Sequence, residues 1–215
     1  MILPMKDTRT AKSRLGGAPE ERRQLAIEMA RDTLGAVVSA SCVDGVVAVC
    51  DRDEDVESFE LPGATVVVRP GLSLNEAVRA GAELVRADDA SRNLAVLPGD
   101  LPYLRSTELE AALRRAARFA ATCMGDRTGR GTTLTTARGG IDLVPSYGVD
   151  SLARHREAGA VEVGAPAWSG LRRDVDFPGS RGHLCTRPAH EKPPGATSLR
   201  LSVGALDDLD DLGSV

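Results

Sequence analysis

The sequence contains few aromatic residues, few lysines and no long apolar run. Aromatic residues make up 3% of its 215 positions, whereas hydrophobic residues in all make up 42%. No window approaches the roughly 18 apolar residues that a membrane-spanning helix needs. The first residues also lack the apolar core of about 7 to 15 residues that a secretion signal carries. We therefore expect a globular, cytoplasmic protein with no membrane partner.

Three further absences narrow the class of function. The formal net charge is −4, so no global positive field favours nucleic acid as a partner. The cysteines form neither a CxxC pair nor a zinc spacing, and we expect reduced, buried thiols at Cys42, Cys50, Cys123 and Cys185. No GxxxxGK(S/T) motif occurs and no GxGxxG follows the first strand, which excludes the standard phosphate loop and the dinucleotide fingerprint.

Lysine occurs three times, and two of the three copies lie close together near the start of the chain. The opening segment "MILPMKDTRTAKSRL" is a short apolar run that breaks at Pro4 and leads into Lys6, Arg9, Lys12 and Arg14. A compact ammonium charge suits a phosphate ligand. The alternative for such a small basic cluster is an ordinary solvated loop.

Extended and helical patterns alternate along the first half of the chain. Continuous β-branched or apolar runs, each short enough for a strand covered on both faces, occupy residues 45–50, 64–69 and 93–97. Apolar residues recur at helical spacing in segments that begin at Pro19, Leu74 and Ser106, with Ser106 as the expected cap. The alternation predicts an α/β fold of three layers with a mostly parallel central sheet, where ligands bind at the carboxyl ends of the strands.

The second half of the chain is less regular. We expect a strand at 132–136, a short helix from about residue 150 to 158, and extended pieces near Val161 and Leu171. From residue 177 the sequence is rich in Pro, Gly and Ser and shows no sustained period. These patterns predict one folded domain over residues 1–176 and a largely disordered tail over residues 177–215.

Three aspartates follow predicted strands. Asp100 comes after the run at 93–97, in a turn "LPGDLP" that two prolines stiffen. Asp174 and Asp176 alternate in "LRRDVD", so in a strand both would point the same way. Carboxylates that converge from two strand ends suit Mg²⁺, which takes its other ligands from water and phosphate. A single aspartate is more often a turn or cap residue, so the hypothesis depends on the whole set.

A glycine-rich loop, "GDRTGRGTTL", precedes the predicted strand at 132–136. Backbone N–H groups in such loops can cradle an anion. An ordinary flexible hairpin loop is an equal alternative. His155 lies on the short helix that follows, and we expect it to pack or cap rather than to catalyse.

Five motifs now occur in a fixed order over residues 1–176, namely "PMKDTRTAKSRL", "LPGDLP", "GRGTTL", "YGVDSLARHREAG" and "LRRDVD". In them the chain resembles the phosphoenolpyruvate and 2-phospho-L-lactate guanylyltransferases of coenzyme F-420 biosynthesis. The resemblance implies a Rossmann-like nucleotidyltransferase fold over residues 1–176. It also implies transfer of GMP from GTP to a small phosphorylated three-carbon acid, with release of pyrophosphate and no protein nucleophile. The downstream transferase of the same pathway is a further expected partner.

The resemblance also implies roles for particular residues. The expected catalytic residues are Lys12, Arg14 and Asp100, and Lys6 would help Lys12 and Arg14 to hold the triphosphate. One or two Mg²⁺ would be held by Asp100, Asp174 and Asp176. Gly71 and Asn75 are candidates for the contact to the base or ribose. The acceptor acid would be held by Thr132, Gly148 and Ser151, and the Arg-rich, Lys-poor composition favours phosphoenolpyruvate as this acid.

Three alternatives stay open at this point. A molybdenum cofactor or sugar-phosphate nucleotidyltransferase has the same fold, but its glycine-rich first loop is missing here. A phosphatase could use "DVD", although that motif should open its domain. A non-catalytic nucleotide-binding module would fit termini that depart from the family, whose members we expect to start several residues earlier and to continue with Thr-Pro after Asp176.

Overall fold

The computed structural model describes residues 1–5, 18–175 and 199–201. Its strands are β1 (Ile2–Pro4), β2 (Val46–Cys50), β3 (Ala64–Val68), β4 (Leu94–Val96), β5 (Ala121–Gly125), β6 (Thr132–Ala137), β7 (Val161–Glu162) and β8 (Leu199–Leu201). Its α-helices are α1 (Pro19–Val38), α2 (Val56–Phe59), α3 (Leu74–Asp88), α4 (Ser106–Ala116) and α5 (Ser151–Glu157), and its 3₁₀ helices are η2 (Asp53–Asp55) and η3 (Gly170–Arg172).

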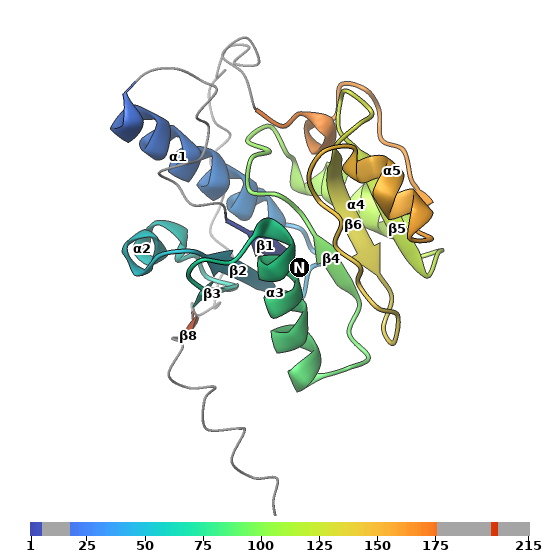
Figure 1. Cartoon of the computed structure of the whole chain (residues 1–215), viewed down its shortest axis with the longest axis horizontal. Helices are drawn as coiled ribbons and strands as arrows, with labels where there is room; N and C mark the ends of the chain where they lie inside the picture. Colours follow the sequence, from blue (N-terminus) through green and yellow to red (C-terminus); the bar gives the residue numbers. More distant parts are fainter. Residues whose placement is uncertain (6–17, 176–198, 202–215) are drawn as a thin grey trace, which may run out of the picture.

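An eight-stranded sheet in the order β7-β5-β6-β4-β1-β2-β3-β8 forms the centre of the fold (Figure 1). Neighbouring strands run parallel except at β6, which is antiparallel to both β4 and β5. In Figure 1, β5, β6 and α5 lie together at one side of the molecule, and α2, β2 and β3 lie at the other. The predicted α/β fold with a mostly parallel sheet is confirmed.

The helices cover both faces of this sheet, because alternate strand residues face opposite sides. Leu3 of β1 packs in a core cluster with residues of α1, α2 and α4. Its neighbour Ile2 packs in a second cluster with Ala77 and Val78 of α3. The fold therefore has three layers, with α3 alone among these helices on its face of the sheet.

Two helix starts follow directly from the sequence. Pro19 occupies the first turn of α1, where its missing N–H group costs no hydrogen bond. Ser73 caps α3, because its hydroxyl accepts from the N–H of Glu76 while the Glu76 carboxylate accepts from the N–H of Ser73 at 2.8 Å. This reciprocal capping box fixes where the chain turns from the end of β3 into α3.

Some sequence expectations are wrong in detail. Ser106 is the first residue of α4 and not its cap, because Glu108 reaches back to the N–H of Arg105 at 3.2 Å and fixes Arg105 as the capping position. Leu171 lies in the 3₁₀ helix η3 and not in an extended segment, because the Ser169 hydroxyl accepts its N–H group and closes a tight turn.

The cysteine prediction holds in part. Cys50 and Cys123 are buried reduced thiols, but Cys42 is exposed because it lies in the turn after α1. Burial raises the pKa of the Cys50 thiol to about 12, as expected for an inert core cysteine. Cys185 lies outside the described residues.

The tail is described over three residues only. Within residues 177–215, Leu199–Leu201 form β8, which pairs with β3. The rest of the predicted tail, and the domain boundary after residue 176, lie outside the described residues and stay predictions. In the part of the chain that the structure describes, no helix is long and apolar enough to cross a membrane.

Strand directions determine which loops meet. The parallel strands β1, β2, β3 and β4 all end at the same edge of the sheet. Because β6 is antiparallel to β4, with Val96 opposite Thr135, the first residue of β6, Thr132, lies beyond the end of β4. The loop that carries Asp100 and the beginning of β6 therefore share this edge, where ligands bind in such sheets.

Candidate active site

The loop that carries Asp100 is anchored by one buried hydroxyl group. Thr33 of α1 accepts the N–H of Leu101 at 3.0 Å, and its hydroxyl lies 3.3 Å from the carbonyl of Gly99. A Cβ atom at Gly99 would lie 2.9 Å from the Met5 sulfur, so the Met5 side chain would have to shift. Thr33 thus holds the loop at Leu101, and Asp100 itself is half-buried in the loop after β4.

Asp174 lies beside this loop. The N–H of Val175 donates to the backbone carbonyl of Asp100 at 3.3 Å, so the segment after η3 runs alongside the loop after β4. Asp174 is half-buried and lies in an irregular segment rather than in the strand that its alternation with Asp176 predicts. The predicted convergence of the Asp100 and Asp174 segments is therefore present in the fold.

Two arginines hold the chain next to Asp174 through contacts with other parts of the protein. The guanidinium of Arg172 donates to the carbonyls of Gly125 at 3.1 Å and Asp126 at 2.9 Å, at the end of β5. Arg173 stacks over the ring of Tyr103, with its guanidinium carbon 4.5 Å from the ring centre. Both contacts tie the chain on the amino side of Asp174 to rigid parts of the fold.

The predicted metal site is tested only in part. Asp176, its third ligand, lies outside the described residues, and among those that are described no group of three or more His, Cys, Asp and Glu is spaced to hold a metal ion. The two described aspartate segments do lie together, and carboxylate oxygens are the ligands that Mg²⁺ prefers. Asp100 and Asp174 are of the residue type that would hold Mg²⁺, and the metal site as a whole stays a prediction.

A group of buried polar side chains lies where β6 begins. The Ser151 hydroxyl, on the first turn of α5, donates to the Thr132 hydroxyl at 3.1 Å. Thr132 also contacts Nδ1 of His155 at 3.0 Å. All three side chains are buried. Thr132 and Ser151, which were predicted to hold the acceptor, are therefore in direct contact, whereas their binding role stays a prediction.

Gly148 completes this cluster through the backbone. Its carbonyl accepts the N–H of Ser151 at 3.2 Å. Its φ of +124° is strained for any other residue, and a Cβ atom would lie 3.0 Å from the guanidinium of Arg154. The turn that brings Ser151 to Thr132 therefore requires glycine at this position.

Asn75 and Gly71, the candidates for the nucleoside contact, both make protein contacts. The Asn75 amide accepts the N–H of Tyr147 at 2.8 Å and donates to the Tyr147 carbonyl at 3.2 Å. The N–H of Gly71 donates to the Asp51 carboxylate at 2.7 Å, which links the ends of β2 and β3. Asn75 thus holds the segment that leads to Gly148, a role that the sequence did not indicate.

The residues with predicted roles in triphosphate binding, Lys6, Lys12 and Arg14, lie outside the described residues. Sequence reasoning did not identify Thr33, Arg172 or Asn75 as positioning residues. For Thr33 and Arg172 no signal was available, since a helical Thr and an Arg beside two Asp residues occur in many contexts. For His155 the expectation that it packs rather than catalyses agrees with its burial.

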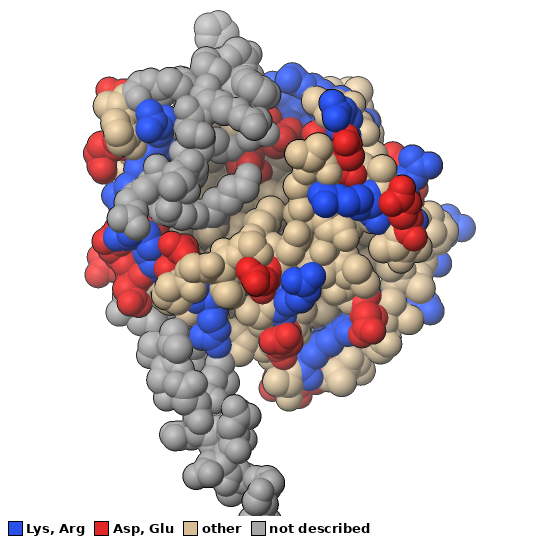
Figure 2. All heavy atoms as spheres, in the orientation of Figure 1, with Lys and Arg blue, Asp and Glu red and all other residues tan. Residues whose placement is uncertain are grey.

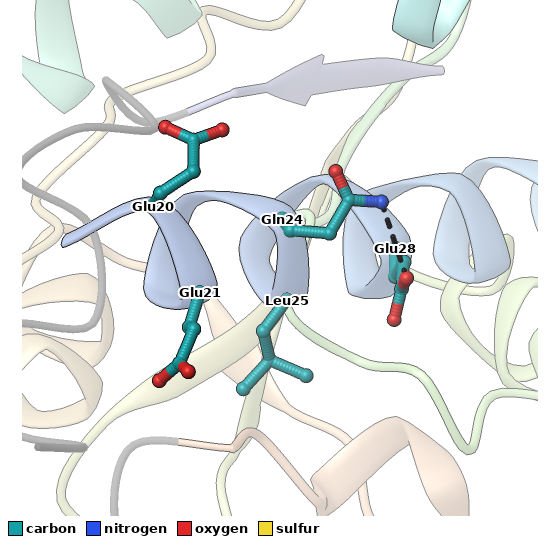
Figure 3. Close-up of a pocket in the computed structure, with 5 residues that line it drawn as sticks. All are labelled: Glu20, Glu21, Gln24, Leu25 and Glu28. Atoms are coloured by element: carbon teal, nitrogen blue, oxygen red, sulfur yellow. Dashed lines mark hydrogen bonds between the residues drawn. The ribbon is translucent and has the colours of Figure 1, made fainter. Parts of the chain in front are cut away.

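A hollow on α1 does not resemble an anion site. It is lined by Glu20, Glu21, Gln24, Leu25 and Glu28 along the first turns of the helix, and Gln24 donates to Glu28 at 3.2 Å (Figure 3). Its carboxylates would repel phosphate. On the face shown in Figure 2, acidic and basic side chains are interspersed.

A mostly parallel sheet whose carboxyl edge carries aspartates from two loops, beside a glycine-rich turn and buried hydroxyls, has the architecture of a nucleotidyltransferase. Two solved structures share this fold. One, assigned as a nucleotide-diphospho-sugar transferase from Desulfovibrio desulfuricans G20, has a TM-score of 0.61 at 18% identity and covers 82% of this chain and 81% of its own. The other, 4-diphosphocytidyl-2C-methyl-D-erythritol synthase, has a TM-score of 0.55 at 15% identity and covers 83% of this chain and 93% of its own.

The chain belongs to the family described as Guanylyl transferase CofC like, which matches residues 1–164. It is 39% identical over 182 residues to the phosphoenolpyruvate guanylyltransferase of Streptomyces coelicolor, covering 83% of this chain and 86% of that protein. It is 40% identical over 183 residues to the enzyme of the same name from Streptomyces scabiei, covering 82% of this chain and 85% of that protein. The family predicted from the five motifs is confirmed, and the protein is a guanylyltransferase by family.

Proposed function

We propose that this protein transfers GMP from GTP to phosphoenolpyruvate, releases pyrophosphate, and requires Mg²⁺. The observation that carries the proposal is the family match over residues 1–164, together with relatives named phosphoenolpyruvate guanylyltransferase at about 39% identity. The reaction would serve the biosynthesis of coenzyme F-420, in the cytoplasm, and the product would pass to the downstream transferase of that pathway.

In the proposed reaction a phosphate oxygen of the acceptor attacks the α-phosphorus of GTP. The bond from this phosphorus to the bridging oxygen of the β-phosphate breaks, and pyrophosphate leaves with that electron pair. No protein nucleophile is needed, so the protein contributes position and charge neutralisation. Lys12 and Arg14, assisted by Lys6, would bind the triphosphate, where the leaving group gains negative charge.

Asp100 and Asp174, with Asp176, would hold Mg²⁺ at the carboxyl edge of the sheet. The bound ion would neutralise phosphate charge and orient the triphosphate. The protein's own part is to keep the two described carboxylate segments together, through the Val175 to Asp100 hydrogen bond and the Thr33 anchor. Such rigid placement is what an in-line transfer requires of its surroundings.

The acceptor would bind at the start of β6, next to this edge. Thr132 and Ser151 supply hydroxyl groups, and the open turn at Gly148 brings backbone groups close to the same position. These groups suit an anionic acid that carries a carboxylate and a phosphate. 2-Phospho-L-lactate is the second candidate, because it differs from phosphoenolpyruvate only in having a single bond in place of the carbon–carbon double bond.

The test is pyrophosphate release from GTP with each acid in turn, with the diphosphate product identified by mass spectrometry. We expect turnover with phosphoenolpyruvate in the presence of Mg²⁺ and none after chelation. ATP, CTP and UTP should be poor donors. Turnover with 2-phospho-L-lactate alone would change the acceptor, and turnover with neither acid would refute the function.

A further inference from the structure

His155 is a fully buried histidine at the centre of the hydroxyl cluster. It lies on α5, 2% exposed, and its ring touches polar groups on two sides. Nε2 accepts the backbone N–H of Ser146 at 3.0 Å. Nδ1 lies 3.0 Å from the hydroxyl oxygen of Thr132. The ring is also packed edge-on against Tyr147, with the ring centres 5.0 Å apart, which fixes its orientation.

These contacts determine which ring nitrogen carries the proton. A backbone N–H can only donate, so Nε2 must be the unprotonated nitrogen that accepts from Ser146. Burial lowers the pKa of His155, which favours the neutral ring. A neutral ring whose Nε2 is bare carries its proton on Nδ1. Nδ1 is therefore a donor, and its proton lies between the Thr132 hydroxyl and the Ser151 backbone, to which His155 is also hydrogen-bonded.

The tautomer of His155 determines how many protons the hydroxyl groups of Thr132 and Ser151, here called the hydroxyl pair, can together donate to a ligand. A hydroxyl group has one donor and two acceptor positions. Thr132 accepts from Nδ1 of His155, and one hydroxyl proton is used in the contact between Ser151 and Thr132. The pair has two hydroxyl protons, so one remains for a third partner. With the opposite tautomer, Nδ1 would accept that second proton and the pair would have none to offer.

The strand geometry supports this arrangement. The pairing of β5 with β6 shifts register next to Gly125, which lies opposite Thr132, while Met124 lies opposite Leu134. Thr133 is the extra residue, as in a β-bulge. Such bulges re-aim side chains at the ends of strands. Here the extra residue directly follows Thr132, which contacts both Ser151 and His155.

We propose that His155 is a positioning residue that holds the Thr132 and Ser151 hydroxyl pair as a hydrogen-bond donor, so that the pair selects an anionic oxygen of the acceptor. This inference rests on the proposed function, because it concerns the acceptor of that reaction. It assigns no catalytic step to His155, whose buried ring does not touch the reacting atoms. The expected ligand group is a carboxylate or phosphate oxygen, which accepts two or more hydrogen bonds and donates none.

The first test separates acceptor binding from the amount of folded enzyme. His155→Phe keeps a ring but removes both nitrogens, and we expect the KM for the acceptor acid to rise by about tenfold to a hundredfold, as for a lost hydrogen bond to a charged group. The KM for GTP should stay within about twofold. Arg156→Gln, on the exposed side of the same helix, is the matched control and should leave both constants unchanged.

The second test asks whether His155 acts through the hydroxyl. In a Thr132→Val background, His155→Phe should raise the acceptor KM by less than about twofold, because the group that His155 orients is already gone. If the effects of the two substitutions on the acceptor KM instead multiply, His155 does not act through Thr132 and the inference is wrong. His155→Asn, which keeps an N–H donor on the side of Thr132, should recover part of the affinity.

A third measurement is independent of activity. Nitrogen-15 NMR of the wild-type imidazole should show the neutral ring with its proton on Nδ1, and loss of that signal in His155→Asn assigns it among the three histidines. A proton on Nε2 would overturn the inference. Absence of turnover by the wild-type protein with either acid would refute the proposed function instead, whereas normal turnover with an unchanged acceptor KM in His155→Phe would refute only the role of His155.

Discussion

The side-chain amide of Asn75 pairs with the backbone of Tyr147 in both directions, through hydrogen bonds of 2.8 Å and 3.2 Å. The two residues lie far apart in the sequence, and the pair ties the first turn of α3 to the segment that leads into Gly148. Because Gly148 in turn bonds to Ser151, a displacement at Asn75 would be passed to the acceptor side of the site.

Asn75→Ala should therefore raise the KM for the acceptor more than the KM for GTP. Each lost hydrogen bond is worth about 0.5 to 1.5 kcal/mol, so we expect a change of about tenfold. Steady-state kinetics with each substrate varied in turn gives both constants. If the KM for GTP rises instead, Asn75 contacts the base or ribose, as the family resemblance implies.

Asp174→Asn should weaken the apparent affinity for Mg²⁺ more than the affinity for GTP. The substitution keeps the shape of the side chain and removes the charge that a divalent cation needs. Titration of pyrophosphate release with Mg²⁺ at saturating GTP measures the effect. Asp142→Asn is the matched control, since its side chain is 99% exposed and should leave the titration unchanged. Equal losses of Mg²⁺ and GTP affinity would indicate a structural aspartate.

Thr33→Val should destabilise the protein and slow turnover. The substitution leaves the N–H of Leu101 without its partner at a buried position, at a cost of about 1 to 3 kcal/mol. It also removes an anchor of the loop that carries Asp100. Urea unfolding and pyrophosphate release measure the two effects, and Thr33→Ser, which keeps the hydroxyl, should restore most of both. A stable variant with normal turnover would show that the Thr33 anchor does not matter.

Much of the sheet could be predicted from the sequence because strands such as β2, β3 and β4 are short continuous apolar runs, and the start of α1 at Pro19 carries its own local signal. The vicinity of Asp100 and Asp174 was also predicted, although Asp174 follows the 3₁₀ helix η3 rather than the predicted strand. These features depend on local patterns and on the rules of parallel sheets.

The contacts that position the site could not be predicted. The partners of Thr132 and His155 depend on a register shift in the β5 to β6 pairing and on how α5 packs against β5, neither of which has a local sequence signal. In the sequence Arg172 is only a basic residue close to two aspartates, whereas in the structure its guanidinium donates to the backbone carbonyls of Gly125 and Asp126. Hydrogen bonds to the backbone of distant residues become visible only in the folded structure.

Lys12→Ala should reduce turnover by a factor of about 10² or more without unfolding the protein. A cation that meets charge as it develops on the leaving pyrophosphate typically contributes that much. Lys192→Ala is the matched control, because it removes the same charge at another position outside the described residues. Pyrophosphate release and circular dichroism test both variants. Wild-type turnover in Lys12→Ala would indicate that the basic opening segment is an ordinary solvated loop and does not bind the triphosphate.

The last prediction concerns pH and the buried ring of His155. Burial, with a contribution from the charge of Arg154, lowers the pKa of this histidine below its ordinary value of 6.5, although a hydrogen bond to the Ser151 backbone opposes this effect. As the pH falls below about 6.5, the unfolded chain therefore takes up a proton at His155 while the folded protein does not.

The free energy of unfolding should consequently fall as the pH is lowered from about 6.5 toward the depressed pKa, by about 1.4 kcal/mol for each pH unit of that interval. Well above pH 6.5 His155 is neutral in both states and should contribute no slope. The amino group of Met1, whose pKa burial lowers to about 6 from 8.0, adds a slope of the same sign at higher pH. Urea unfolding of the wild-type protein and of His155→Phe across this pH range isolates the contribution of His155 to the slope. The slope below about pH 6.5 should be smaller in the variant, and identical slopes in the two proteins would show that His155 is as easily protonated in the folded state as in the unfolded chain.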